Sequence, residues 1–357
     1  MKPLFKCELD YLPSNHLSQI YTGFEQLKKA GVIDLSIRYT GEKTGATKPV
    51  LKVKINNKYK VIYDTLDGLN WIKGSIEDNL NYIKTHLDAD FYFKRSYSKN
   101  ILKYFPSHCK VYPLGLNYYV ESEDFYFVGI KESIKHYIKE IYVITKILKI
   151  NKNFYTNDFE FYPFVSKETK ILFFTRLWTP DDIIGKHFKS QIESINENRV
   201  RYIKACKKEF GDCFTGGLEN DTYSNLHAKG LNAEDLIVPY SLTNRKTFLN
   251  TIKNHNICIT TTGLHNSIGW KFGEYVAASR AIVSEPLAYE LPGDFKSPKN
   301  YLAFSNEEEL ISRINLLREN KDLLFEIMKN NFHYYNNYVR PDKLVLNTLL
   351  AIYMQCY

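Results

Sequence analysis

Short apolar runs alternate with amphipathic segments through the second half of this chain, and this order constrains the fold more than any other feature. The runs are KILFFTRLW (170–178), DCFTGGL (212–218), DLIVPY (235–240), ICITT (257–261), AIVSE (281–285) and YLAFS (301–305). Runs of this length predict buried strands, and the longer segments between them have helical spacing. Strands that alternate with helices predict a doubly wound parallel sheet, which is a Rossmann-like domain.

The first half is also predicted to be α/β. We expect helices at 16–30 and 75–87, strands at 32–39, 90–93 and 110–116, and a hairpin over 51–64 that turns at Asn56-Asn57. A chain of 357 residues can form two domains that each bury a core. The predicted organisation is an N-terminal α/β domain (1–162), a Rossmann-like domain (163–338) and a C-terminal helix (339–357) that can pack back on the N-terminal domain.

Composition narrows the class of protein. The apolar fraction of 44% and charged fraction of 25% are those of a globular protein. The net charge of +8 suits an anionic ligand and does not by itself indicate nucleic acid. The six cysteines have no metal-type spacing, and no export signal or membrane-spanning run is visible, so we expect a cytoplasmic protein with free thiols.

Ligands of open α/β sheets bind at the carboxyl ends of the strands, so the loops there hold the candidate site. Arg176 ends the first strand of the second half, and Tyr240 ends the third. After ICITT come Gly263, His265 and Asn266 in a small, polar loop that leads into a helix. Free N–H groups at a helix start can face an anion, so we predict that this loop binds a negatively charged ligand.

Three polar residues are predicted to share one face of that helix. Ser267, Lys271 and Glu274 are spaced i, i+4 and i+7. The cation suits a diphosphate and the carboxylate suits the two hydroxyls of a ribose. The alternative is a solvated Lys–Glu pair above a capped joint. Gly269 and Gly273 would weaken a helix, which indicates close approach at those positions.

With these residues in place, TRLW after the first strand and GWKFGEYVAASRAIVSEP (269–286) resemble the nucleotide-sugar domain of GT-B fold glycosyltransferases of the group 1 type. The resemblance covers about residues 165–340. It implies two Rossmann-like domains that face a central cleft. It also implies that Arg176 and Lys271 contact the diphosphate of a UDP- or GDP-linked sugar and that Glu274 binds the ribose. No cofactor and no metal are implied.

The sequence departs from the family pattern at one important position. Many retaining members have two glutamates seven residues apart, and the first of these would stand at Ser267. The stereochemical outcome therefore stays open. Lys186, after DDIIG, is a weaker candidate for a second phosphate ligand because its surroundings are altered.

An inverting reaction would need a base in the N-terminal domain. Asp64 and Asp67, at the end of a predicted strand, are the candidates, although Asp-x-x-Asp-Gly is also ordinary turn chemistry. Lys94 and Arg95 end another strand, and we expect His16 and His86 to be surface histidines. Asp88 and Asp90 precede a strand, which is not the position of a metal-binding Asp-x-Asp.

The segment 131–150 has apolar residues at helical spacing with lysines between them. We expect its apolar face to pack on its own domain; the alternative is peripheral association with a membrane. The predicted function is transfer of a sugar from a nucleotide-sugar donor to a glycan or lipid-linked acceptor in surface polysaccharide synthesis. The alternatives are a UDP-sugar epimerase of the same architecture and a non-catalytic, two-lobed sugar-binding protein.

Overall fold

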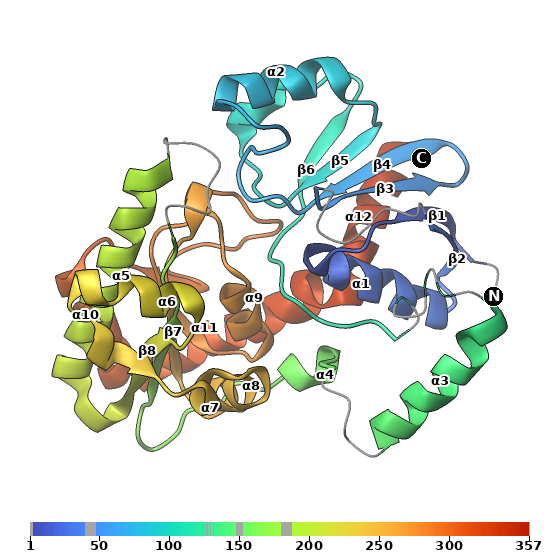
Figure 1. The fold of residues 1–357 in the computed structure, drawn as a ribbon. Helices are drawn as coiled ribbons and strands as arrows, with labels where there is room; N and C mark the ends of the chain where they lie inside the picture. Colours follow the sequence, from blue (N-terminus) through green and yellow to red (C-terminus); the bar gives the residue numbers. More distant parts are fainter. Residues whose placement is uncertain are drawn as a thin grey trace. The chain divides into compact units, whose positions relative to one another are not determined.

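The computed structural model describes residues 3–39, 48–123, 125, 128, 130, 132–147, 153–179 and 188–356. The chain divides into two compact units, each with its own six-stranded sheet. Unit 1 comprises residues 1–72, 76–159 and 337–357, and unit 2 comprises residues 73–75 and 160–336. Figure 1 labels the helices and strands along the chain.

Unit 2 contains an entirely parallel sheet with the strand order β12-β11-β10-β7-β8-β9. Its strands are β7 (Ile171–Thr175), β8 (Phe214–Glu219), β9 (Ile237–Val238), β10 (Ile257–Thr260), β11 (Ala281–Ser284) and β12 (Tyr301–Ala303). From β7 outward this is the 3-2-1-4-5-6 order of a Rossmann domain, with the switch point between β7 and β10. The predicted doubly wound sheet is confirmed in this unit.

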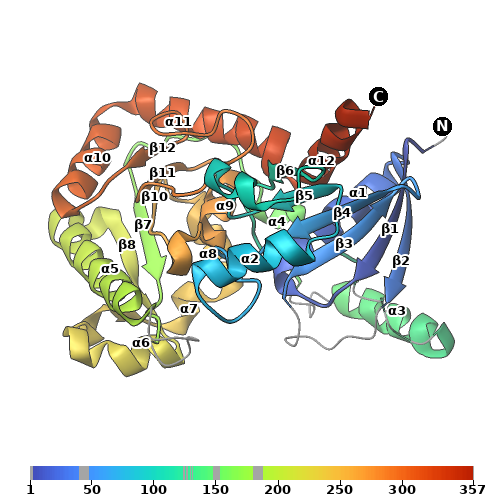
Figure 2. The same ribbon diagram turned by 90° about the horizontal axis from the view of Figure 1, so that it is seen from above.

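Helices cover both faces of the unit 2 sheet, with α5, α10 and α11 on one side and α8 and α9 on the other (Figure 2). They are α5 (Lys189–Phe210), α6 (Thr222–His227), α7 (Tyr240–Thr243), α8 (Arg245–Lys253), α9 (Trp270–Ala277), α10 (Glu307–Glu319) and α11 (Lys321–Tyr334). Apolar residues of α5, α10 and α11 join alternate strand residues in one core. On the other face Phe248 of α8 lies between Phe174 of β7 and Tyr275 of α9, with ring centroids 6.4 Å from each. Because both faces are covered, the strands read as continuous apolar runs.

Unit 1 has a mixed sheet with the order β2-β1-β3-β4-β5-β6, in which β3 is antiparallel to both neighbours. Its strands are β1 (Phe5–Tyr11), β2 (Ile33–Tyr39), β3 (Val50–Ile55), β4 (Tyr59–Asp64), β5 (Phe91–Lys94) and β6 (Lys110–Pro113). Its helices are α1 (Ser18–Lys29), α2 (Ile76–His86), α3 (Glu132–Ile147), α4 (Thr156–Phe159) and α12 (Pro341–Cys356), with short 3-10 helices at Asn15–Leu17 and Lys99–Tyr104. The α/β prediction is therefore confirmed for this half too.

Two features of the unit 1 sheet can be compared directly with the elements predicted from the sequence. The β3–β4 hairpin turns at Asn56 and Asn57, with φ of 53° and 57°, which confirms the predicted hairpin. Strand β1 is absent from the predicted elements, although Phe5, Cys7 and Leu9 alternate with exposed or half-buried residues. That two-residue period was the missed signal.

The two faces of the unit 1 sheet are packed differently. One face joins α1 and α12 in a core that includes Cys7, Leu51, Val53 and Tyr63. On the other face, α2 and the turn after β5 cover β4 and β5 through Ile62 and Tyr92. The segment of unit 1 before β7 ends at Phe159, whereas the sequence placed the boundary after residue 162. Helix α12, the last element of the chain, belongs to unit 1 and packs against α1.

Candidate functional site

Three neighbouring strands of unit 2 end at one edge of the sheet and bring charged residues there. In the order β8-β7-β10, Glu219 ends β8, Arg176 follows β7, and Thr261 follows β10. The strands are parallel, so their carboxyl ends lie side by side at the position where open α/β sheets bind ligands. The Arg176 side chain is exposed, with its guanidinium 4.7 Å from the centre of the Trp178 ring.

Lys271 of α9 reaches this edge from the next helix. Its Nζ donates to the carbonyl oxygen of Phe174 at 2.7 Å and forms an ion pair with Glu219. Lys271 is the main cause that holds the pKa of Glu219 below its ordinary value of 4.5, against the effect of burial, and Arg176 adds to it. Lys271 pairs with Glu219 directly, and Arg176 lies near enough to the same carboxylate to contribute to its lowered pKa. Glu219 itself was not predicted.

Glu274 is buried one turn further along α9, with 1% of its side chain exposed. Its Oε1 accepts from Arg245 Nη1 of α8 at 2.6 Å. Its Oε2 is buried and has no hydrogen-bond partner within the described part of the chain. Lys271 and Glu274 have separate partners, so the alternative of a solvated Lys–Glu pair is wrong. A buried carboxylate oxygen that lacks a donor is costly, and a ligand hydroxyl could supply the donor.

The loop between β10 and α9 has a strained backbone. His265 and Asn266 both have positive φ, 59° and 55°. The backbone of His265 is held on both sides, since its N–H donates to Gln191 Oε1 at 3.3 Å and its carbonyl accepts from Tyr289 OH at 2.7 Å. A Cβ at Gly263 would lie 2.8 Å from Ser267 Oγ, so a larger residue there would displace the Ser267 side chain. Strained loops that are held in this way are common at ligand sites.

The start of α9 differs from the expectation. The helix begins at Trp270, because its N-cap Gly269 is extended (φ −67°, ψ 160°). Ser267 therefore lies before the helix and does not share a helical face with Lys271 and Glu274. A Cβ at Gly269 would meet no atom within 4 Å, so close protein packing does not explain this glycine. No side chain caps α9 at Gly269, and within its first turn the Phe272 N–H donates to the Gly269 carbonyl oxygen at 3.1 Å.

Arg199 of α5 holds the strand ends in place and was missed by the sequence analysis. It is 6% exposed, and its guanidinium donates to the Arg176 carbonyl at 2.7 Å and to Thr261 Oγ1 at 3.0 Å. Burial lowers its pKa to about 10. The signal was weak, since an arginine in the middle of a charged helix usually faces solvent. Beside it, Glu285 Oε2 accepts from the backbone N–H and the hydroxyl of Thr262, both at 2.8 Å.

Two other residues that were predicted to bind the donor are not placed with these side chains by the structure. Tyr240 begins α7 after β9 and its side chain is 68% exposed, so its predicted role stays a prediction. Lys186 lies outside the described residues.

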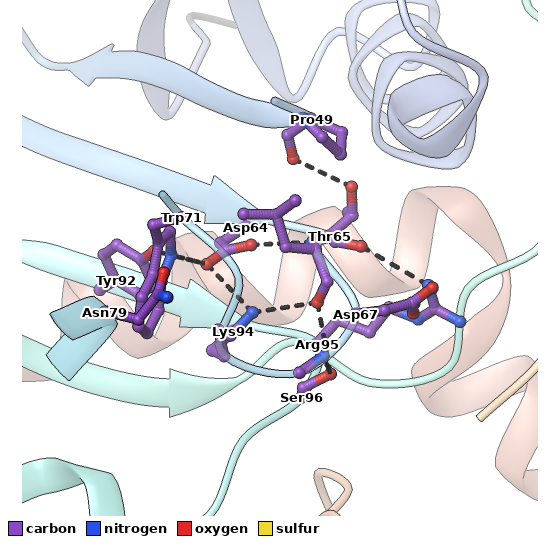
Figure 3. Close-up of polar contacts among 12 residues, drawn as sticks. Pro49, Asp64, Thr65, Asp67, Trp71, Asn79, Tyr92, Lys94, Arg95 and Ser96 are labelled. Atoms are coloured by element: carbon purple, nitrogen blue, oxygen red, sulfur yellow. Dashed lines mark hydrogen bonds and ion pairs between the residues drawn. The ribbon is translucent and has the colours of Figure 1, made fainter. Parts of the chain in front are cut away.

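In unit 1, Asp64 is at the centre of a buried polar network (Figure 3). One oxygen accepts from Trp71 Nε1 at 2.7 Å and from Tyr92 OH at 2.5 Å, and the other accepts from the Leu66 N–H at 2.8 Å. Lys94 Nζ lies 3.1 Å away, and both side chains are 0% exposed. Burial lowers the pKa of Lys94, and Asp64 opposes that shift. A base must touch its substrate, so the prediction that Asp64 is the catalytic base conflicts with this geometry; Asp64 positions the loop instead.

Asp67 lies on the exposed side of the same loop and pairs with Arg95 Nη1 at 2.8 Å, with 38% of its side chain exposed (Figure 3). His16, which lies in the turn that leads into α1, is half-buried and close enough to interact with both. Burial and the positive charge of Arg95 lower the pKa of His16, and Asp67 opposes them. His16 was expected at the surface; the sequence could not show it because its neighbours come from the loops after β4 and β5.

The remaining predictions concern metals and membranes. Asp88 pairs with Lys60 Nζ at 2.7 Å, and Asp90 accepts from the Lys60 N–H at 2.7 Å, so both belong to a turn. Within the described ranges no cluster of three or more His, Cys, Asp or Glu could hold a metal ion. The same residues contain no helix that is long and apolar enough to span a membrane.

Helix α3 differs from the expected packing. Ile134, Tyr137, Ile141 and Ile144 form one stripe and are 49%, 65%, 61% and 54% exposed. Only Tyr142 among its described apolar side chains is buried. The expectation that this apolar face packs on its own domain is therefore wrong for the described residues.

The chain is similar to several solved structures at low sequence identity. No protein-family model matches the chain, and no curated protein matches it either. Among solved structures, the Anabaena protein Alr3699/HepE, in complex with UDP-glucose, is 11% identical over 98% of this chain and 100% of that chain, with a TM-score of 0.47. WaaG, a glycosyltransferase involved in lipopolysaccharide biosynthesis, is 11% identical over 98% of both chains, with a TM-score of 0.42.

A third similarity covers part of the chain. The C-terminal domain of a glycosyl transferase group 1 family protein (LpcC) from Francisella tularensis is 11% identical over 51% of this chain and 95% of that chain, with a TM-score of 0.32. The roles of individual residues rest on the site geometry.

Proposed function

We propose that this chain is a glycosyltransferase of the GT-B type, which transfers a sugar from a nucleotide-diphosphate sugar to a hydroxyl of a glycan or lipid-linked acceptor. One observation carries the proposal. At the carboxyl ends of the unit 2 strands, Lys271 pairs with Glu219 and Arg176 lies nearby. Glu274, one turn after Lys271 in α9, is buried and has one carboxylate oxygen without a hydrogen-bond partner among the described residues. Two cations can bind a diphosphate, and a buried carboxylate can accept hydrogen bonds from the hydroxyls of the ribose.

The donor would bind along the start of α9. The ribose hydroxyls would donate to Glu274 Oε2, whose carboxylate is held in place by the hydrogen bond from Arg245 to Oε1. The diphosphate would replace Glu219 as the partner of Lys271, while Arg176 approaches from the end of β7. The start of α9 and the loop from Gly263 to Ser267 would complete the phosphate contacts.

These groups also suit the chemistry. The acceptor oxygen bonds to the anomeric carbon as the bond from that carbon to the diphosphate breaks, and the electron pair passes to the departing phosphate oxygen. Two cations and a helix N-terminus can stabilise that charge, so we propose turnover that does not require a metal. The acceptor proton would go to His16, or to Asp67, in an inverting reaction.

Membrane association is a separate part of the proposal. The exposed stripe of α3 carries four large apolar side chains on a helix whose sequence also has Lys135 and Lys139. A helix of this kind can lie in the interface of an anionic membrane, where lipid-linked acceptors are found.

The test is incubation with UDP-, GDP-, CMP- and dTDP-linked sugars, with and without EDTA, and measurement of nucleotide release. We expect release from one donor class, unchanged by EDTA and reduced in Glu274→Ala, which should bind the donor more weakly. An epimeric nucleotide sugar without release would favour the epimerase. Binding of a nucleotide sugar without any reaction would favour the sugar-binding protein, and absence of binding to all four would contradict the donor site.

A further inference from the structure

Unit 1 has a hollow of about 940 Å³ on the face of its sheet that α1 and α12 do not cover. The walls are formed by β1 to β4 on one side and by the last turns of α2, with Tyr82 and His86, on the other. Its volume is in the range of ligand pockets. All its lining residues belong to unit 1, so it is separate from the strand edge of unit 2.

Positive charge is in excess in this hollow. Six cationic side chains line it: Arg38, Lys48, Lys52, Lys54, Lys58 and Lys60. They are opposed by three carboxylates, those of Glu8, Asp10 and Asp88. Two of the carboxylates are already neutralised, since Asp10 pairs with Arg38 and Asp88 with Lys60, both at 2.7 Å.

Lys52 and Lys54 are two further cations of this wall, and Lys52 lies near enough to Asp88 to help lower the pKa of that carboxyl. Both point from β3 to the open face, both are exposed, and neither forms an ion pair or side-chain hydrogen bond with a residue in the described ranges. Lys54 lies directly opposite Lys60 on the neighbouring antiparallel strand. On its other side Lys54 lies opposite Glu8 of β1, and Lys60 pairs with Asp88, so carboxylates lie beside the cations on this wall.

Aromatic and apolar residues of the hollow, together with its carboxylates, suit a sugar. The Tyr82 and His86 rings are stacked 4.7 Å apart at 15°, and both residues line the hollow. The floor includes apolar side chains such as Val50, Ile62 and Leu87. Carboxylates among the lysines can accept hydrogen bonds from hydroxyls, whereas they would repel the continuous phosphates of a nucleic acid.

We propose that this hollow binds an acidic oligosaccharide, with ionised carboxylates of the sugar at Lys52 and Lys54 and hydroxyls at the neighbouring carboxylates. Such a ligand would be an anionic segment of a glycan. The proposal does not depend on the donor site of unit 2, because binding is measured without a nucleotide sugar.

The test is calorimetric titration of the full chain with a tetramer of galacturonic acid, and with its fully methyl-esterified form as the uncharged match. We expect the acidic tetramer to bind, the ester to bind far more weakly, and Lys52→Gln/Lys54→Gln to lose about tenfold in affinity for the acid. Lys207→Gln/Lys208→Gln, which removes the same charge from two exposed positions of α5, serves as the control and should bind like the parent.

Several results would overturn the proposal. Equal affinity of the parent and the Lys52/Lys54 variant would show that the tetramer does not bind in the hollow. An equal loss of affinity in the α5 variant would show that the loss depends only on the overall charge of the protein. Stronger binding of a single-stranded RNA tetramer, or of vesicles with anionic lipid, with the same dependence on Lys52 and Lys54, would assign the surface to that partner instead. Circular dichroism and the melting temperature of each variant separate these results from unfolding.

Discussion

Glu274 and Arg245 form an ion pair of 2.6 Å between α9 and α8 in which the carboxylate is almost completely buried. One carboxylate oxygen is thereby oriented and the other is left without a donor in the described structure. The pair fixes the rotamer of Glu274 before any ligand arrives. A preorganised acceptor of this kind loses less entropy when a ribose binds.

The first prediction concerns this acceptor. Glu274→Ala should weaken binding of UDP, or of whichever nucleoside diphosphate the donor screen selects, by about tenfold or more, because a charged acceptor of two hydroxyls is lost. Isothermal titration calorimetry measures the change. Glu326→Ala, at an exposed position of α11, is the control and should bind like the parent. Unchanged affinity in a folded Glu274→Ala protein would contradict the ribose assignment.

The second prediction concerns the pH dependence of the Lys271–Glu219 pair. The pKa of Glu219 is lowered in the folded chain, so its contribution to stability is present above the ordinary value of 4.5 and is lost as the pH falls through the lower, folded value. Glu219→Gln should therefore melt at a lower temperature than the parent at neutral pH, and the difference should shrink in acid below pH 4.5. A difference that stays constant from neutral pH to strong acid would show that this charge pair does not stabilise the fold. Glu326→Gln should show no difference at either pH.

The third prediction concerns His16 as the base. Its pKa lies below the ordinary 6.5, so the neutral imidazole should persist, and kcat/KM should hold, to a lower pH than an unperturbed histidine would allow. Asp67 raises this pKa, so Asp67→Asn should move the acid limb of the profile further down. His16→Gln should lower turnover about a hundredfold or more with unchanged UDP affinity.

The control for this prediction is His108→Gln, at an exposed position of the same unit, which should keep the parent profile. If Asp67→Asn moves the acid limb upward or leaves it in place, His16 is not the group that titrates. Normal turnover in His16→Gln would show that another residue is the catalytic base.

The fourth prediction concerns the buried Asp64–Lys94 pair. Lys94→Met should destabilise the protein by about 3–5 kcal/mol, because the Asp64 carboxylate would stay buried without its counter-ion. Urea unfolding followed by circular dichroism measures this loss. Lys60→Met removes the exposed pair with Asp88 and should change the midpoint very little. Similar midpoints for the two variants would mean that the buried network does not hold the loop.

The fifth prediction concerns the exposed stripe of α3. Ile141→Glu/Ile144→Glu should reduce co-sedimentation with vesicles that contain anionic lipid, because the inserted apolar surface is lost. Leu226→Glu on α6, an equally exposed apolar position at 64%, should sediment like the parent. Equal sedimentation of the α3 variant and the parent would remove membrane binding from the proposal.

The local pattern of apolar residues was sufficient to predict the Rossmann-like fold of unit 2. Each strand of unit 2 is covered on both faces, so the apolar runs at 170–178 and 257–261 could be read directly, and their ends located Arg176 and the loop after β10. Lys271 and Glu274 followed from helical spacing. The start of α9 was placed too early because Gly269 is extended, a backbone choice that the pattern of apolar residues does not record.

What the sequence alone determined is which residues end the strands and which helix follows them, since these depend on contacts a few positions apart. Only the tertiary structure decided their roles. Glu219, Arg199 and His16 gain their partners from segments distant in the chain, and burial separates Asp64 from Asp67 although the two are three residues apart. Charge pairing and solvent access depend on distances in space, and spacing along the chain fixes those distances only within a single element.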